Sequence, residues 1–470
     1  MFALSLATAI VAINLATPHE LAPSDQGKQA QYVLDVLLHE NWIAPMNSAT
    51  GEAATKPPLY TWLAAGLALL LGRIDEWMLR TPAALSAIGL VAIVHEMGRR
   101  LGGSRVALVA AVALATNHQF TRISVLARPD GLLALLLAAQ MLVYLRCRED
   151  GRDTTGRIAM LCLLSGAAWL TKGPAGGLAS LVVLVHLISS RELRRAWKLS
   201  ALPSAAGIAV FGLWFVMALR VGGDAVWNDM VRGEALRHAT TGRSWNPLYY
   251  VPYLFARLVP WAFFFLPAAV LVWREMRAPR EGVAPLGLTL PLAWLFTMLV
   301  VFGLLPHKRP DLIYVAAPAA MLLVARLAAE GCPWSWPRRV LPWTAAAGLL
   351  LFVLTCVRDA QLAERYAYAA FGRNARAEAS RRGKQLVHTG FNNGATSFHL
   401  RIAAPPMTEE EIAAIPRPVL VVATDELRGK LEARFGPLEI VDAADGNPET
   451  SDPRRLVLCV LTGHQRERGL

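Results

Sequence analysis

Long stretches of this chain are apolar and carry almost no charge. Four of the clearest are Val106–Ala115, Leu132–Leu145, Leu178–Ile188 and Trp343–Leu354. Most of them extend toward the roughly 20 residues that a helix needs to cross a bilayer. Over the whole chain 54% of the residues are hydrophobic and 17% are charged, against about 25% charged in an average soluble domain. The apolar runs therefore predict membrane-spanning helices.

The formal net charge is +12, and nearly all of the excess lies in the apolar part of the chain. Residues 357–470 are almost balanced, with 16 Lys or Arg and 15 Asp or Glu. In the apolar part the basic residues gather in short loops at Arg99–Arg105, Arg146–Arg157, Arg191–Lys198, Arg274–Arg280 and Arg338–Arg339. These loops alternate with less basic ones, which is the pattern of cytoplasmic loops. The charge thus indicates membrane topology and does not favour nucleic acid as a partner.

The apolar runs and loop charges together predict an all-α polytopic membrane protein with about eleven transmembrane helices and a small C-terminal α/β soluble domain. Met1–Ala16 is interpreted as a first span that stays attached, because it lacks preceding basic residues and an evident small-residue cleavage site. The other spans are predicted at residues 81–97, 105–121, 130–146, 158–171, 174–189, 200–219, 250–273, 286–304, 312–328 and 340–357. The transmembrane domain is therefore expected to occupy residues 1–356.

A long outer loop, residues 17–80, is predicted between the first two spans. Within it Gln29–His39 is predicted to be a helix, and Leu59–Leu71 is interpreted as a helix that lies in the membrane interface. Counting Leu59–Leu71 as a crossing would reverse every later loop and break the charge rule. The loop is therefore expected on the outer face, together with the tail.

The tail, residues 357–470, has the composition of a soluble domain. Strands are predicted at Pro418–Thr424, Leu438–Val441 and Leu456–Leu461. Thr424 is predicted to cap a helix whose first turn holds two acidic residues. This pattern predicts a small α/β domain outside the cytoplasm.

Lysines occupy three short turns on the outer face. The turns are Lys56-Pro57-Pro58, Lys172-Gly173-Pro174 and His307-Lys308-Arg309. Charges close to hydrocarbon need a partner or a function. Each ammonium could hold a phosphate as a point charge, or it could reach lipid headgroups, as lysines near helix ends often do. Convergence of the three turns would favour a phosphate site.

Two aspartates on the same face are candidates for acid–base chemistry. Asp25 lies in the first loop, and Asp130 ends the segment Ala127-Arg128-Pro129-Asp130 at the entrance to a span. A carboxylate can take the proton of an acceptor hydroxyl or amine, so Asp25 is the candidate base. The alternative for Asp25 is a solvated loop acid. Asp130 could also be a helix N-cap, and it is expected to pair with Arg128 or Arg122.

Metal binding is only weakly indicated. His19, Glu20, Asp25 and His39 share the first loop, but no spacing among them defines a site. The five cysteines are scattered, with neither a metal-type spacing nor a disulfide framework. No metal ligands are therefore assigned, and a divalent cation is at most a weakly supported cofactor.

Several short motifs follow one another in a fairly specific order: Asp25 with a following helix, Asn41-Trp42-Ile43-Ala44-Pro45, Lys56-Pro57-Pro58-Leu59-Tyr60-Thr61-Trp62, Arg80-Thr81-Pro82-Ala83, Arg128-Pro129-Asp130-Gly131, Thr171-Lys172-Gly173-Pro174, Asn246-Pro247-Leu248-Tyr249-Tyr250 with Pro260-Trp261, and Lys308 ahead of Tyr314 and Pro318. Over most of residues 20–330 the chain thereby resembles the bacterial lipid-to-acceptor transferases of the protein O-mannosyltransferase superfamily, which include aminoarabinose transferases acting on lipid A. The resemblance implies a GT-C fold and an inverting transfer on the outer face, from a donor of undecaprenyl-phosphate-sugar type.

The resemblance also implies roles for individual residues. Asp25 matches the first-loop catalytic aspartate, Asp130 matches its second-loop partner, and Lys56 matches a ligand of the lipid phosphate. Further basic positions around the donor are implied at Lys172, Arg243 and Lys308. 

Two positions depart from the family pattern. The first-loop motif of the family is usually Asp-Glu, where this chain has Asp25-Gln26. In the aminoarabinose branch a glutamate precedes the Lys-Pro-Pro motif, where this chain has Thr55. The sugar, the acceptor and any metal held by that glutamate are therefore left open.

The expected function is an inverting glycosyltransferase that moves a sugar from a polyprenyl-phosphate donor to an envelope acceptor, either a lipid A-like glycolipid or a protein. The chain is expected in the bacterial inner membrane, among membrane lipids, with its active site and residues 357–470 on the periplasmic side. A polytopic flippase or transporter is the main alternative, although its charges would be expected near the bilayer midplane. A noncatalytic partner is a third interpretation.

Overall fold

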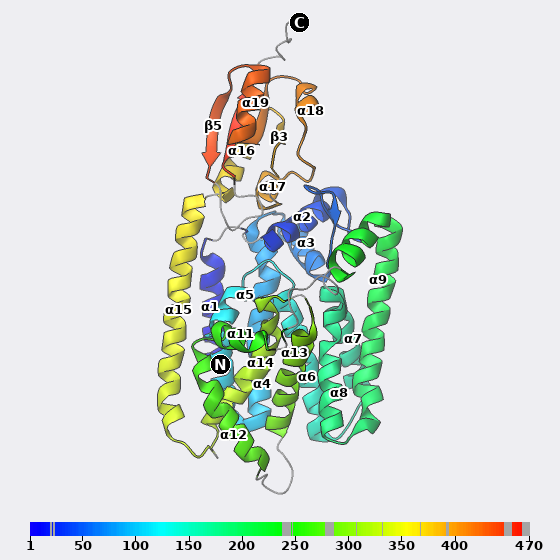
Figure 1. The fold of residues 1–470 in the computed structure, drawn as a ribbon, viewed down its shortest axis with the longest axis vertical. Helices are drawn as coiled ribbons and strands as arrows, with labels where there is room; N and C mark the ends of the chain where they lie inside the picture. The colour runs from blue at the N-terminus through cyan, green and yellow to red at the C-terminus, as the bar shows by residue number, and fades with distance from the viewer. Residues whose placement is uncertain are drawn as a thin grey trace. The chain divides into compact units, whose positions relative to one another are not determined.

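The computed structural model is mostly helical and divides into two compact units (Figure 1). It describes residues 1–18, 21, 24–236, 246, 248–277, 286–306, 308–330, 332–366, 368–391, 394–445 and 454–462. The first unit comprises Met1–Ala16, Thr55–Tyr60 and Arg80–Cys356. The second unit comprises Thr17–Ala54, Thr61–Leu79 and Val357–Leu470.

The first unit is built from helices. They are α1 (Phe2–Ala16), α4 (Glu76–Ala115, from Arg80 on), α5 (His118–Ile123), α6 (Asp130–Asp150), α7 (Thr155–Lys172), α8 (Leu178–Ser189), α9 (Leu202–Val226), α11 (Tyr250–Arg257), α12 (Phe265–Arg277), α13 (Leu286–Leu304), α14 (Ala317–Ala325) and most of α15 (Trp336–Tyr366). Short 3-10 turns join several of them, among them η1 (Gly173–Gly177) and η7 (Pro310–Ala316). Their apolar faces form one continuous core.

In the described residues, seven helices are long and apolar enough to cross a membrane. The number is eight if α11 and the helix Trp261–Arg277, which meet at a bend of 117°, form one span. This is fewer than predicted from the sequence for two reasons. α1 has only 15 residues. In addition, α4 and the continuous run Thr155–Ser189, which comprises α7, η1 and α8, are each counted once although each contains two predicted spans. The chain is thus a multi-pass membrane protein, and its helices explain its composition.

α4 and the run from α7 to α8 each reverse direction at a glycine. Gly103 interrupts α4 with a φ of 82°, and a Cβ on Gly98 would lie 2.8 Å from the Cα of Ala107. Gly173 separates α7 from α8 with a φ of 55°, and a Cβ on Gly176 would lie 2.3 Å from the backbone nitrogen of Trp169. Residues this close in sequence meet only if the chain folds back, and only glycine permits so close an approach.

Buried hydrogen bonds tie the helices of the first unit together. The Tyr144 hydroxyl and the His186 Nδ1 lie 2.7 Å apart, and the His186 Nε2 lies 3.1 Å from the Thr289 hydroxyl, which links α6, α8 and α13. The Asn14 side chain donates to the Thr121 carbonyl at 2.6 Å and thereby fixes α1 against α5. An unpaired polar group among these helices would be costly, so such bonds favour one packing arrangement.

The second unit contains a four-stranded sheet in the order β3-β4-β6-β5. The strands are β3 (Leu386–His388), β4 (Val419–Thr424), β5 (Glu439–Ala444) and β6 (Leu456–Leu461). β3 runs parallel to β4, and the other neighbours are antiparallel. The two central strands are buried throughout, as their runs of Val and Leu indicate.

The helices of the second unit are α2 (Ser24–His39), most of α3 (Leu59–Leu71), α16 (Tyr368–Arg382), α17 (Gly394–Leu400), α18 (Glu409–Ala413) and α19 (Asp425–Phe435). α3 has the predicted bounds, and its place in the membrane interface stays a prediction. The predicted cap is confirmed, because the Thr424 hydroxyl accepts a hydrogen bond from the backbone nitrogen of Leu427 at 3.4 Å. α2 begins earlier than the predicted Gln29, so its first turn contains Asp25.

The reversal at η1 predicts that Gly176 tolerates no side chain. Changing Gly176 to Ala places a Cβ against the backbone of the preceding helix, and overpacking of this kind destabilises by about 1–3 kcal/mol. We expect a lower melting temperature in detergent, measured by intrinsic tryptophan fluorescence. The control is Gly156→Ala on α7, where an added Cβ meets nothing within 4 Å. Equal melting temperatures for the two variants would contradict the packing described.

Candidate functional site

The start of α6 carries a buried cluster of charged side chains. Asp130 accepts a hydrogen bond from the Lys172 ammonium at 2.6 Å, and its other oxygen lies 3.1 Å from the Nε of Arg128. Asp130 and Arg128 are only 4% and 5% exposed. The predicted pairing with Arg128 is thus present. The alternative role as an N-cap is wrong, because Pro129 is the cap residue and leaves the Asp130 side chain to its ion pairs.

Asp311, the second residue of η7, extends this cluster. The Arg128 guanidinium bridges the two carboxylates, since it also contacts Asp311 at 3.0 Å. Arg122 contacts the other Asp311 oxygen at 2.5 Å, and Arg257 lies 4.0 Å from it. Asp311 was not among the predicted site residues. The available signal was an acid directly after Lys308-Arg309-Pro310, at the entrance to a span.

Within the described residues, four cationic side chains, Lys172, Arg128, Arg122 and Arg257, lie within 4.0 Å of the two carboxylates. Among these contacts the cations outnumber the carboxylates, and Arg122 and Arg257 are partly exposed. An excess of buried positive charge is costly unless an anion balances it. Guanidinium groups hold phosphate or carboxylate oxygens through paired hydrogen bonds, whereas an ammonium acts as a point charge. The cluster is accordingly suited to a phosphate group.

The Lys56 turn lies beside this cluster. A Cβ on Gly173 would lie 4.0 Å from the Cγ of Pro57, so the turns that carry Lys56 and Lys172 are neighbours. Four residues after Lys56, Tyr60 is buried against Leu132, which is two residues beyond Asp130. Two of the three predicted lysine turns thus lie together at the start of α6.

The third turn reaches the cluster through Arg309, whose charge acts on Asp130, and through the nearby Asp311, and not through Lys308. The Lys308 ammonium donates to the carbonyls of Phe302 and Gly303 at 3.1 and 2.5 Å, at the end of α13. It also lies 5.9 Å from the centre of the Tyr250 ring. Partial burial lowers the pKa of the Lys308 ammonium. Lys308 therefore stabilises the carbonyl end of a helix, while its expected contact with a phosphate remains a prediction. Its neighbour His307 lies outside the described residues.

The remaining predicted site residues fall elsewhere. Asp25 belongs to the second unit and lies half-buried in the first turn of α2, where free backbone N–H groups favour a negative side chain. Arg243, His19 and Glu20 lie outside the described residues. Among the residues that are described, no group of three or more His, Cys, Asp or Glu side chains could hold a metal ion.

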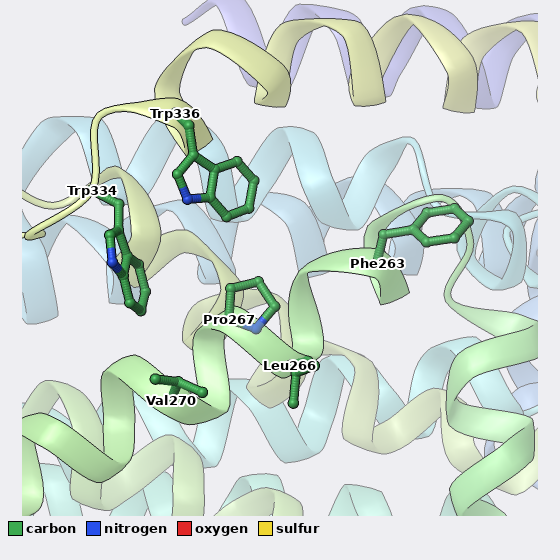
Figure 2. Close-up of a pocket in the computed structure, with 6 residues that line it drawn as sticks. All are labelled: Phe263, Leu266, Pro267, Val270, Trp334 and Trp336. Atoms are coloured by element: carbon green, nitrogen blue, oxygen red, sulfur yellow. The ribbon is translucent and has the colours of Figure 1, made fainter.

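Two cavities in the first unit are apolar. One, of about 310 Å³, lies between α12 and the segment leading into α15, and Figure 2 shows Trp334 and Trp336 across it from Leu266 and Val270. The other, of about 530 Å³, is lined by residues of α11, α12, α13 and α14. Linings of this kind accommodate hydrocarbon, whereas a sugar or phosphate needs convergent polar groups. Among the described residues, the charged cluster at α6 therefore suits a phosphate better than either of these cavities does.

Comparison with known proteins identifies relatives of this chain. Residues 55–219 match the family described as dolichyl-phosphate-mannose-protein mannosyltransferase. An undecaprenyl phosphate-alpha-4-amino-4-deoxy-L-arabinose arabinosyl transferase of Pseudomonas fluorescens is 26% identical over 320 residues, which cover 65% of this chain and 53% of the relative. The corresponding transferase of Serratia proteamaculans is 29% identical over 236 residues, covering 48% and 40% of the two chains. The chain thus spans about half the length of the curated relatives it matches.

Solved structures share the fold more completely. ArnT from Cupriavidus metallidurans, solved in complex with undecaprenyl phosphate, superimposes with a TM-score of 0.73 at 19% identity and covers 99% of both chains. The oligosaccharyltransferase AglB from Archaeoglobus fulgidus, solved with an inhibitory peptide and a dolichol phosphate, superimposes with a TM-score of 0.56 at 12% identity over 97% of this chain and 74% of AglB. At these identities the likeness establishes the fold.

The position of Asp311 predicts a large effect of its removal on stability. Asp311→Ala leaves the partly exposed Arg122 and Arg257 without this carboxylate and leaves buried Arg128 with Asp130 alone. Removing one partner of a buried ion pair typically destabilises by about 3–5 kcal/mol. The control is Asp150→Ala, which breaks the ion pair between Asp150 and Arg157. The Asp150 side chain is 49% exposed, so its loss should destabilise by about 1 kcal/mol or less. Thermal unfolding of the purified variants measures both. Similar losses for the two would show that burial of the Asp311 cluster is not decisive.

Proposed function

We propose that this chain is a glycosyltransferase that transfers a sugar from a polyprenyl-phosphate donor to an acceptor of the cell envelope, with inversion at the anomeric carbon. The match of residues 55–219 to a mannosyltransferase family and the fold shared with ArnT support this class of enzyme. The observation that carries this proposal is the buried cluster at the start of α6, whose excess positive charge suits a phosphate. The similar transferase of Pseudomonas fluorescens is named for undecaprenyl phosphate, and ArnT was solved with undecaprenyl phosphate bound, which supports the same class of donor.

In this proposal the donor phosphate is the leaving group and is held by cations. Lys56 and Lys172 come from neighbouring turns, and each ammonium stabilises the negative charge that grows on the phosphate as the sugar departs. Lys308 has three donors, of which two reach carbonyl oxygens, and Arg243 is the fourth proposed ligand. Charge stabilisation in a site that excludes water is often the largest single contribution to catalysis, worth about 3–4 kcal/mol per donor.

The two aspartates have different tasks in the proposed reaction. Asp25 takes the proton of the acceptor hydroxyl or amine as that group attacks the anomeric carbon from the face opposite the phosphate. One displacement therefore suffices, and the sugar arrives inverted. Asp130 orients Lys172 and Arg128 through its two ion pairs, so its role is to position cations around the phosphate.

We propose a topology of about eleven crossings, obtained when the reversals at Gly103 and Gly173 each separate two spans and when α1 and the bent pair α11–α12 each count as one. The basic loops are then cytoplasmic. The reaction accordingly takes place on the periplasmic face of the inner membrane, where the first loop and the tail domain of residues 357–470 also lie. The acceptor is an envelope glycolipid of the lipid A type or a protein.

Asp25→Asn tests the base. The amide keeps the shape of the side chain but accepts no proton, so we expect kcat to fall about 10²- to 10⁴-fold with the donor KM nearly unchanged. The assay follows labelled sugar from a panel of undecaprenyl-phosphate sugars into envelope fractions. The control is Glu52→Gln in the same loop, where an exposed carboxylate pairs with Lys28 at 3.2 Å. Activity of Asp25→Asn near that of the wild type would refute the assignment, and folded wild type that uses no donor would favour a flippase.

Lys56→Ala tests the phosphate site. Loss of a charge-assisted hydrogen bond is worth about 1.5–3 kcal/mol, so we expect the donor KM to rise about 10- to 100-fold. Lys198→Ala is the control, because Lys198 lies in a predicted cytoplasmic loop beside exposed Trp197. Initial rates over a range of donor concentrations provide both constants. An unchanged donor KM would remove Lys56 from the phosphate site.

A further inference from the structure

α2, the helix whose second residue is Asp25, buries several polar side chains. Its polar residues Gln26, Gln29, Gln31 and Asp35 are each no more than 5% exposed. Gln29 donates to the Thr61 hydroxyl at 2.7 Å. Polar side chains are buried in this way only where specific partners receive them. The orientation of α2 is therefore fixed along its length by hydrogen bonds.

The tail, residues 357–470, also contacts α2 directly. Near the start of α2, Gly27 meets Gly394, the first residue of α17. A Cβ on Gly394 would lie 2.7 Å from the Gly27 carbonyl oxygen, and a Cβ on Gly27 would lie 3.0 Å from the backbone nitrogen of Ala395. The Gln31 amide donates to the Gly394 carbonyl at 3.1 Å. The two backbones therefore touch at a pair of glycines, two residues from Asp25. Figure 1 shows α17 beside α2.

α17 is itself held firmly within the second unit. On one side a Cβ on Gly372 of α16 would lie 2.4 Å from the Cβ of His399. On another side the His399 Nε2 lies 3.2 Å from a Glu76 carboxylate oxygen, with both side chains largely buried. The Arg401 guanidinium, just beyond α17, donates to the Ile74 carbonyl at 3.4 Å. α17 can therefore transmit the position of the tail to α2.

We propose that the tail, through α17, positions the catalytic base: Gly394 and Gln31 are positioning residues that set where Asp25 lies. This inference rests on the proposed function, because it assigns Asp25 the role of base. A helix moves as a rigid unit, so a displacement at Gly27 is carried to Asp25. Misplacement of a reacting group by about 1 Å can lower a rate about 100-fold. The tail is then part of the catalytic apparatus of this chain, whichever acceptor it takes.

The test adds one methyl group at the contact. Gly394→Ala forces α2 and α17 apart, and we expect kcat to fall about 10- to 100-fold with the donor KM within twofold of the wild type, because the phosphate ligands lie outside this contact. The control is Gly429→Ala on α19, where the added Cβ meets nothing within 4 Å. Wild-type kcat for Gly394→Ala, in a protein that Asp25→Asn inactivates, overturns the inference and leaves the proposed function intact.

A double variant separates positioning from general damage to the fold. If Gly394→Ala acts by moving Asp25, it should lower the residual rate of Asp25→Asn little further, since the base is already absent. Losses that multiply in full would overturn the inference. If Gly394→Ala does not fold, Gln31→Met serves instead, because it keeps the length of the side chain and loses the bond to Gly394. An unchanged kcat for Gln31→Met would then overturn it.

Discussion

The bridge that Arg128 makes between two carboxylates organises the polar part of the first unit. One guanidinium joins Asp130 at the start of α6 to Asp311 at the start of η7. Each of those carboxylates holds another cation, Lys172 or Arg122. None of these charges could be buried alone, because each would lose its hydration without compensation. The ends of three membrane segments are therefore held together by a single chain of ion pairs. In the proposed reaction this preformed cluster of cations binds the donor phosphate.

Local features of the sequence predicted the local features of the structure. Uninterrupted apolar runs predicted the helices, the bounds of α3 and β6 agree with expectation, and the Thr424 cap needs only the next three residues. The pairing of Asp130 with Arg128 was foreseen because the two residues share one short motif. In each case the physical cause acts over a few residues: helical periodicity, a free backbone amide or a charge in the adjacent turn.

Features that depend on distant packing were missed. Asp311 lies 183 residues after Arg128, and no pattern in the sequence says that η7 and the start of α6 meet. Lys308, like Lys172, lies in a short turn followed closely by a proline. Its ammonium nevertheless lies against the carbonyl end of α13. The grouping of the first loop with the tail was also not predicted, because it depends on glycines such as Gly27 and Gly394, which have no side chain to indicate a partner.

The contact between α2 and α17 joins positions 363 residues apart, and this separation has a consequence for biosynthesis. During translation the apolar helices of the first unit are made before α17, so Gly27 and Gln31 of α2 lack their partner until then. Only after residue 394 has been synthesised can the helix that carries Asp25 reach its final packing. The polar cluster at α6 uses residues only as far as Asp311, so it can assemble earlier. The charged cluster at α6 can therefore form before α2, which carries Asp25, packs against α17.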